Sequence, residues 1–345
     1  MQNLLDPAIL FFVFGVLAGA LKSNLEIPPP ISRFLSLYLL MALGLKGGFA
    51  LAHSGMTAQV AASLGCAVFL AVIIPALGYL ALKKILSPFD AAAVAATYGS
   101  VSAVTFITAV QYLEGQGQPY GGYMAAAMAL MESPAIIMAV VFANMLRNRQ
   151  AATASVPAVS GGVLVLGAGS ATAPAARPAG PGISIGKVLH ESFTDGAQLL
   201  LLGAMLVGLL TGDAGKMAMQ PFTGDLFKGM LAFFLLDMGL LAARNMPQVK
   251  GRSPWLLIYA VAGPLVHAML ALAVAMLLRI PPGDGALLMV LAASASYIAV
   301  PAVLRYAVPE ANPGLYFGLS LGLTFPFNIL LGIPLYVAVA QRVLV

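Results

Sequence analysis

The sequence has very few charged residues for its length. Lys, Arg, Asp and Glu make up 8% of its 345 residues, whereas a soluble domain carries charge on about a quarter of its residues. Apolar residues make up 61%, and the mean hydropathy is +0.96. So little charge cannot cover a surface that faces water. The composition therefore excludes a soluble globular protein and predicts an integral membrane protein.

Reactive and metal-binding residue patterns are also absent from the sequence. The single cysteine, Cys66, lies in an apolar run and excludes an intrachain disulfide or a cysteine-based metal site. We find no phosphate-binding loop, dinucleotide-binding turn or nucleophile elbow. We therefore expect a protein that is not an enzyme and has no cofactor. The net charge of +5 fits basic cytoplasmic loops of a membrane protein, and we expect no nucleic-acid partner.

Long apolar runs recur along the chain, and most are long enough for a helix of about 20 residues to cross a bilayer. A membrane β-barrel would instead show alternating segments of about ten residues. We therefore predict an all-α polytopic membrane protein with about ten transmembrane helices. The runs span residues 8–21, 31–52, 60–82, 91–113, 121–146, 196–211, 226–243, 255–278, 285–307 and 314–340.

One connection is much longer than the others and divides the ten runs into two sets of five. Residues 150–185 are rich in Ala, Gly, Pro, Ser and Val, a composition typical of a flexible linker. We predict a first five-helix repeat over residues 1–149, a linker over 150–188, and a second, inverted five-helix repeat over 189–345.

The basic residues predict the orientation. With the N-terminus outside, four basic residues fall in outside loops and Lys46 falls within a span. The cytoplasmic loops and the linker would hold the rest of the 17: Lys22, Arg33, Lys83, Lys84, Arg147, Arg149, Arg177, Lys187, Arg244, Lys250, Arg252 and Arg305. This excess follows the positive-inside rule, so we expect both termini outside and the linker in the cytoplasm.

The two sets of runs show a weak internal similarity. Residues 39–45 resemble residues 234–240, and residues 121–123 resemble residues 314–316. The pairs Ser100 and Ser102 match Ser294 and Ser296 at one constant separation. Inverted repeats are typical of secondary transporters, whose substrate sites lie where broken helices meet near the midplane.

Runs 4 and 9 are the ones that we expect to be broken. Residues 98–105 place a glycine and several hydroxyl groups in mid-membrane, and residues 294–301 place serines before Pro301 there. Proline removes a backbone donor, and unpaired backbone groups are tolerated only where they line a cavity or find new partners. The alternative is that these serines bond to their own helix. Because two clusters occupy matching positions, we favour a shared site.

Three charged residues fall well inside predicted spans, away from the span ends, namely Lys46, Glu132 and Asp237. A charge at the bilayer centre costs at least about 2.5 kcal/mol unless it is paired or hydrated. We therefore expect Lys46 to pair with Glu132 or Asp237. The cluster would be either a structural salt bridge or a site for a coupling ion.

Four segments of the chain resemble the sodium-dependent bicarbonate transporters known from cyanobacteria. These segments are residues 97–105, 131–135, 291–296 and 309–313. The resemblance implies ten spans in two inverted repeats, with broken helices 4 and 9 crossing, in a carrier that imports bicarbonate with sodium. It also implies a homotrimer in the plasma (bacterial inner) membrane and a PII-like regulator that binds near the linker.

Position by position, the resemblance assigns the substrate to both predicted breaks. It implies a sodium site near Ser100, Ser102, Ser294 and Ser296. The substrate-binding residues that it implies are Gly99, Ser100, Ser102, Thr105, Ser294 and Ser296.

The chain departs from the cyanobacterial pattern at three positions that bear on ion coupling. Tyr297 and Glu132 stand where that pattern has Asp, and Lys46 stands where it has Thr. With Asp237, these residues are our candidates for ion coupling. A charged Lys46 could replace a bound sodium ion, so we expect fewer sodium ions per substrate than in the cyanobacterial relatives, or none. A carrier of another small anion, such as a short carboxylate, and a membrane receptor or scaffold with a docking linker remain the alternatives.

Overall fold

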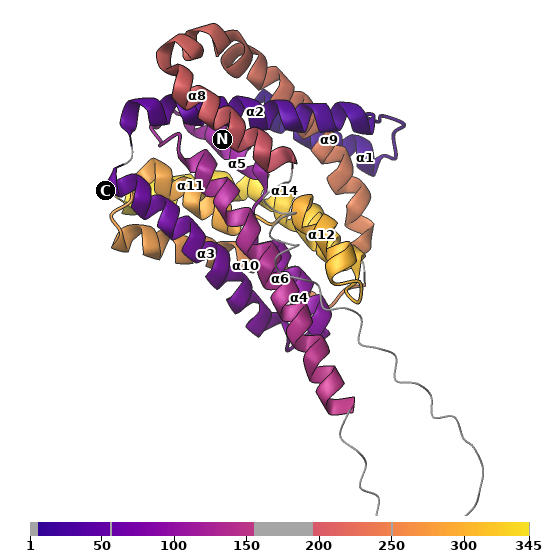
Figure 1. Ribbon diagram of the computed structural model, residues 1–345. Coiled ribbons are helices and arrows are strands. Elements are labelled where there is room, and N and C mark those ends of the chain that lie inside the picture. The colour runs from indigo at the N-terminus through magenta and orange to yellow at the C-terminus, as the bar shows by residue number, and fades with distance from the viewer. Residues whose placement is uncertain (1–5, 56, 155–195, 250, 345) are drawn as a thin grey trace, which may run out of the picture.

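The structure is a computed structural model that describes residues 6–55, 57–154, 196–249 and 251–344. Within these residues the chain is helical and forms no β-strand (Figure 1). Seven helical segments have the length and hydropathy of a membrane span, and one of them, Gly196–Val249, is long enough for two. The prediction of an all-α polytopic membrane protein is confirmed, whereas the count of ten spans stays a prediction.

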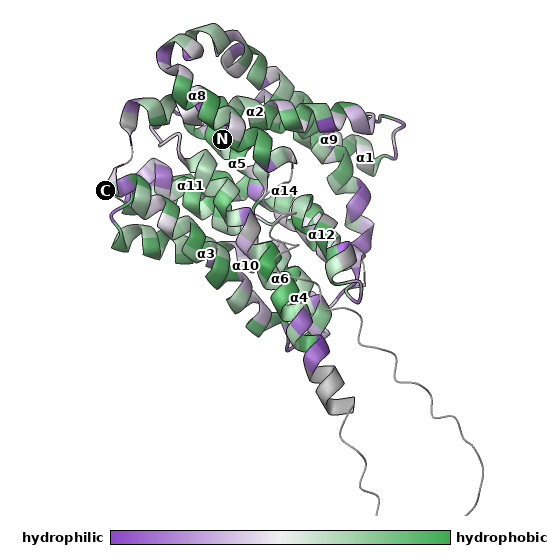
Figure 2. Ribbon diagram, in the orientation of Figure 1, coloured by the Kyte–Doolittle hydropathy of each residue, from purple (hydrophilic) through white to green (hydrophobic). Residues whose placement is uncertain are grey.

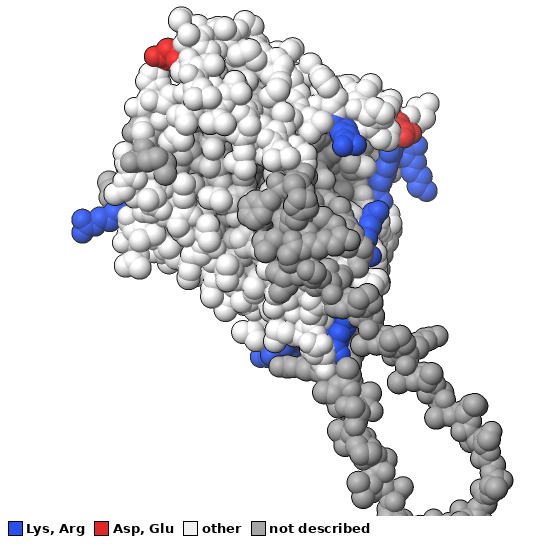
Figure 3. Space-filling model, in the orientation of Figure 1, with Lys and Arg blue, Asp and Glu red and all other residues white. Residues whose placement is uncertain are grey.

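The apolar character of the surface agrees with this assignment. Figure 2 shows hydrophobic residues along most of the helices and hydrophilic residues mainly toward their ends. In the face shown in Figure 3, the charged side chains gather toward the margins. Large exposed side chains such as Phe14, Phe69 and Val266 are apolar, which is the surface expected of helices in lipid.

Each predicted run falls on one helix or on consecutive helices. The run predicted to end at residue 211 continues as a helix to Gln220, with a bend at Gly212, whose φ is +52°. Positive φ is accessible to glycine at little cost. The helices are α1 (Pro7–Ala20), α2 (Pro29–Ser54), α3 (Ala58–Leu82), α4 (Pro88–Gly99), α5 (Ala103–Gly115), α6 (Met124–Ala154), α8 (Gly196–Gln220), η2 (Pro221–Asp225), α9 (Leu226–Asn245), η3 (Met246–Val249), α10 (Pro254–Leu277), α11 (Pro282–Ala293), α12 (Ala299–Ala307), α13 (Pro313–Phe317), η4 (Gly318–Thr324), α14 (Phe325–Phe327), η5 (Asn328–Gly332) and α15 (Ile333–Val343).

Prolines and polar caps determine where many of these helices begin. The helices α1, α2, α4, α10, α11 and α13 all begin at a proline, the position where its missing N–H costs nothing. Before α1, the Asp6 carboxylate accepts the backbone N–H of Ala8 at 2.8 Å. The Asn312 side chain does the same for Gly314 before α13, at 3.0 Å. Such caps satisfy amides that the helix itself leaves unpaired.

The two predicted breaks are present. Run 4 is interrupted at residues 100–102, between α4 and α5, and run 9 at residues 294–298, between α11 and α12. We call these the first break and the second break. The predicted linker lies largely in residues 155–195, outside the described residues, and α6 extends past the predicted boundary at 149.

Close glycine contacts join α1 to α9 and α2 to α8, and α2 also contacts α9. A Cβ at Gly15 of α1 would lie 2.3 Å from the carbonyl oxygen of Leu236 in α9. A Cβ at Gly48 of α2 would lie 2.0 Å from the carbonyl oxygen of Met205 in α8. Small residues let membrane helices approach closely. We call α1, α2, α8 and α9 the four-helix group and the remaining helices the main bundle. Figure 1 shows the four-helix group at the top of the view.

Reciprocal contacts favour the inverted repeat. Asp90, at the start of α4, accepts the backbone N–H of Asn312 at 2.8 Å, just before α13. Asp284, at the start of α11, accepts the backbone N–H of Gly121 at 2.5 Å, just before α6. Asp284 follows Asp90 by the same number of residues as Ser294 follows Ser100. An aspartate of each half thus accepts a backbone N–H from the other half, at equivalent helix starts. The inverted repeat itself stays a prediction.

The glycine packing of α8 predicts a position-specific loss of stability. Gly208→Ala would place a Cβ 2.6 Å from the carbonyl oxygen of Leu45, and overpacking of this kind costs about 1–3 kcal/mol. Gly203→Ala, on the same helix, meets nothing within 4 Å and should be neutral or slightly stabilising. Thermal unfolding midpoints of the purified variants in detergent provide the measurement. Equal losses in both variants would contradict a contact-specific cause.

Candidate functional site

The first break is built from a glycine and a helix cap. A Cβ at Gly99 would lie 2.6 Å from the ring atoms of Pro75 in α3, so a larger residue would displace α4 or α3. Three residues later, the Ser102 hydroxyl accepts a hydrogen bond from the backbone N–H of Thr105 at 3.2 Å and another from the Thr105 hydroxyl at 2.9 Å. Ser102 thereby caps the start of α5 and leaves residues 100–102 extended.

The second break is held directly against the first. The Ser294 hydroxyl donates to the carbonyl of Leu291 at 2.8 Å and accepts the backbone N–H of Ser102 at 3.0 Å. The backbone N–H of Ser296 donates to the carbonyl of Thr97 at 2.8 Å. Two of the backbone N–H groups at the interruptions, those of Ser102 and Ser296, are therefore paired between the two breaks, as burial away from water favours.

The last span supports the breaks through polar residues that the sequence analysis did not single out. The Asn328 side-chain amide donates to the carbonyl of Ala293, the last residue of α11, at 2.8 Å. The Tyr336 hydroxyl holds the Asn328 carbonyl oxygen at 3.0 Å. Thr324 bonds to the hydroxyl of Tyr98 in α4 at 2.6 Å. Ser320, Thr324 and Asn328 recur every fourth residue in an otherwise apolar run, a pattern that could have identified them.

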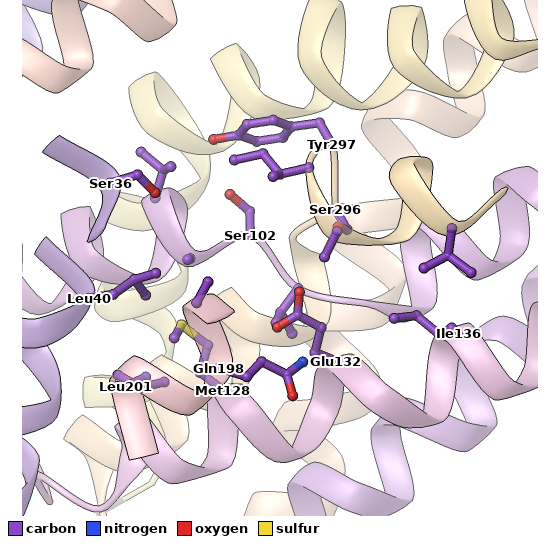
Figure 4. Close-up of a pocket in the computed structure, with 17 residues that line it drawn as sticks. Ser36, Leu40, Ser102, Met128, Glu132, Ile136, Gln198, Leu201, Ser296 and Tyr297 are labelled. Atoms are coloured by element: carbon purple, nitrogen blue, oxygen red, sulfur yellow. The ribbon is translucent and has the colours of Figure 1, made fainter. Parts of the chain in front are cut away.

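A cavity of about 390 Å³ lies where the breaks face the four-helix group. We call it the central cavity (Figure 4). Its polar lining comes from both breaks and from three helices: Ser102, Ser296, Tyr297, Glu132 of α6, Ser36 of α2 and Gln198 of α8.

The predicted site residues fall into two sets, those that line the central cavity and those that do not. Ser102, Ser296, Tyr297 and Glu132 line the central cavity. Gly99, Ser100, Thr105 and Ser294 are buried behind it and shape the breaks. The Ser100 hydroxyl has no hydrogen-bond partner among the described residues. Their roles in binding stay a prediction.

The expected pairing of Lys46 with Glu132 or Asp237 is wrong. Lys46 Nζ instead lies 3.0 and 3.1 Å from the two carboxylate oxygens of Glu114. Asp237, which is buried, accepts the hydroxyl of Ser32 near the start of α2. Lys46 lies about 20 Å further along α2 than Ser32, at a rise of 1.5 Å per residue. Because Asp237 is bonded to Ser32, Lys46 cannot reach it. Lys46 does not line the central cavity, and its proposed replacement of a bound sodium ion loses its geometric basis.

A second and wider cavity continues from the central one. This vestibule, of about 1080 Å³, shares Ser36, Ala197, Tyr297 and Ile298 with the central cavity. It extends toward the starts of α2 and α13 and is lined by Arg33 and Arg305, while no described carboxylate lines it. Its positive charge favours small anions.

An all-α membrane protein in which two interrupted helices meet at a cavity has the architecture of a secondary transporter. The sequence matches the family model of the Na+-dependent bicarbonate transporter superfamily over residues 7–341. The chain therefore belongs to this superfamily, which places it among transporters. The comparison with curated proteins finds no matching relative.

An ion pair stabilises the C-terminal end of α12, which is the end away from the second break. The Arg147 guanidinium at the end of α6 binds both carboxylate oxygens of Glu310, at 2.9 and 2.8 Å. The same guanidinium donates to the carbonyl of Ala307 at 2.9 Å. These hydrogen bonds lower the pKa of Glu310 from its usual value.

The lowered pKa of Glu310 predicts a small stabilisation that depends on pH. A carboxyl group whose pKa is depressed by folding stabilises the protein above its unfolded pKa, and this contribution disappears as the pH falls through the folded pKa. Because the pair is partly exposed, Glu310→Gln should cost less than about 1 kcal/mol at neutral pH. The difference in thermal midpoint between the variant and the wild type should vanish in acid. A difference that stays constant with pH would contradict the prediction.

Proposed function

We propose that this chain imports bicarbonate together with a cation, and that the cation is sodium, as the name of the superfamily implies. The observation that carries the proposal is the position of two helix starts. The first residues of α5 and of α12 both line the central cavity, through Ala103 and Ala299. A helix N-terminus carries about half a positive charge and unpaired N–H groups. Two such ends with the hydroxyls of Ser102 and Ser296 suit a small oxyanion.

The opposite ends of the broken helices suit a cation. The C-termini of α4 and α11, which carry partial negative charge, meet at the breaks through Thr97, Ser294 and Ser296. The buried Ser100 hydroxyl lies at this meeting point without a partner among the described residues. Freed carbonyls and hydroxyls of this kind coordinate sodium in transporters. Glu132 adds a carboxylate to the cavity wall, and its negative charge would attract a cation.

One observation favours a second substrate class. Much of the central cavity wall is apolar, formed by Leu40, Met128, Ile136, Leu201 and Val303. An apolar wall would accept the alkyl end of a short carboxylate, which bicarbonate lacks. The second candidate is therefore a cation-coupled carrier of short carboxylates. A receptor or scaffold would need neither the paired breaks nor the cavity.

The orientation that we propose places the vestibule on the cytoplasmic side of the bacterial inner membrane. The excess of basic residues puts the start of α2 and the end of α6 inside, and the vestibule extends to the start of α2. The structure then corresponds to a state open to the cytoplasm. A homotrimer and a PII-like regulator at the linker are the further partners that we propose from the family.

Uptake of labelled bicarbonate into proteoliposomes tests the proposed function directly. We expect uptake that an inward sodium gradient accelerates and that collapses when sodium is equal on both sides. The assay belongs at alkaline pH, where dissolved inorganic carbon is an anion. Uptake of labelled acetate but not of bicarbonate would support the carboxylate carrier instead. Transport of neither would favour the receptor.

Removal of a cavity hydroxyl should reduce uptake more than it reduces stability. Ser102→Ala loses a hydroxyl of the cavity and a helix cap, whose loss costs about 1 kcal/mol. Ser102→Thr keeps the cap. The matched control is Thr108→Val, because the Thr108 hydroxyl is buried in the same helix, donates to the carbonyl of Val104 at 2.8 Å and does not line the central cavity. We expect uptake to fall at least about tenfold in Ser102→Ala and to persist in Thr108→Val. Equal uptake at equal thermal midpoints would remove Ser102 from the site.

A further inference from the structure

The ion pair of Lys46 connects the two units of the structure. Lys46 lies on α2 of the four-helix group, and Glu114 lies at the end of α5 in the main bundle. The Arg147–Glu310 pair, in contrast, joins two parts of the main bundle. The His53–Asp213 pair joins α2 to α8 inside the four-helix group. Relative movement of the two units would therefore stretch the Lys46–Glu114 pair and leave the other two intact.

Neighbouring contacts fix both partners in place. The Tyr120 hydroxyl donates to the same carboxylate of Glu114 at 2.8 Å. Lys46 Nζ lies 4.5 Å from the centre of the Phe227 ring in α9, a cation–π distance. The next residue, Gly47, packs on the segment before α6, where a Cβ would lie 2.8 Å from the carbonyl oxygen of Gly122. The two units are thus in backbone contact beside the ion pair.

These contacts lie at the end of α2 opposite to the vestibule. The vestibule begins at Pro29 and Arg33 in the first turns of α2, whereas Lys46 and Gly47 follow about four turns later. The central cavity lies between these two levels, at Ser36 and Leu40. One end of the cavity therefore opens into the vestibule, and the other end is covered where the two units touch.

We propose that the Lys46–Glu114 pair is a gate that closes the outer side of the central cavity. The pair is formed when the cavity faces the cytoplasm and breaks when the cavity faces outside. This inference rests on the proposed function for its direction, since the orientation in the membrane comes from there. The side chains of Lys46 and Glu114 are 21% and 31% exposed. Neither side chain is fully buried by the rest of the chain, so the pair can separate without leaving a charge enclosed in the protein core.

Thiol labelling of the cavity from outside tests the gate without measuring transport. The background is Cys66→Ala, which removes the single native cysteine, with Ser36→Cys as the reporter in the cavity wall. A membrane-impermeant maleimide is added to the outer side of oriented proteoliposomes. We expect Lys46→Met to speed modification about two- to fivefold, the range for a partly exposed ion pair. Lys216→Met, at an exposed position of α8, is the matched control and should leave the rate unchanged.

Two further variants test whether the change in labelling rate comes from loss of the Lys46–Glu114 ion pair. The exchange Lys46→Glu with Glu114→Lys should restore slow modification, because it rebuilds the pair with reversed charges. Glu114→Gln should behave like Lys46→Met, and it provides the measurement if Lys46→Met does not fold. An unchanged rate in Lys46→Met or Glu114→Gln, at wild-type thermal midpoint, would overturn the gate. So would fast modification of the exchange variant.

The labelling result and the uptake result can fail separately. Faster labelling in the variants of a chain that transports neither bicarbonate nor acetate would support the gate and reject the proposed function. Sodium-driven bicarbonate uptake combined with unchanged labelling would support the proposed function and reject the gate.

Discussion

The structure depends on how two interrupted helices satisfy their backbone groups inside the membrane. A helix that stops in mid-bilayer exposes N–H and C=O groups, and each unpaired group costs several kcal/mol there. Here the two breaks donate to each other, through Ser102 to the Ser294 hydroxyl and through Ser296 to the Thr97 carbonyl. Neither break would be stable without the other, which ties together segments that are far apart in the sequence.

This mutual dependence explains why the surroundings of the breaks are so restricted. Gly99 must be small because Pro75 packs against it, and Asn328 must present its amide to the end of α11. The four-helix group, in contrast, packs along glycine contacts within itself and faces the breaks across the central cavity. The fold thus combines a main bundle held by directional hydrogen bonds with a second unit whose helices pack in pairs along glycines. That division is what a carrier needs in order to expose one site alternately to two sides.

Some of this arrangement could be predicted from the sequence because it depends on local residue patterns. Apolar runs and prolines indicated the helices, and the paired serine clusters indicated where runs 4 and 9 stop. The same reasoning brought Ser102 and Ser296 to one place, because the two clusters occupy matching positions. Glu132 was noticed as one of three charges inside predicted spans, and the structure places it in the same cavity wall.

The partners of individual residues could not be predicted in this way. Ser36 and Gln198 reach the cavity only because α2 packs against α8, and no local pattern distinguishes them from other polar residues. Lys46 was assigned to the wrong acid because Glu114 lies one residue beyond the predicted end of run 4, and only acids inside predicted spans were considered as partners. Helices that are buried on several sides carry little periodicity, so the sequence does not show which of their faces meet.

The π-helical stretches of the last span have a mechanical consequence. Residues 318–324 and 328–332 are wound more loosely than an α-helix, since each backbone bond reaches five residues back. If the first stretch tightened into an α-helix, everything after it would rotate about the helix axis. Asn328 would then turn away from the carbonyl of Ala293, and the end of α11 would lose its cap. The winding of the final span is therefore coupled to the second break. A rotation of this span would change the conformation at the end of α11.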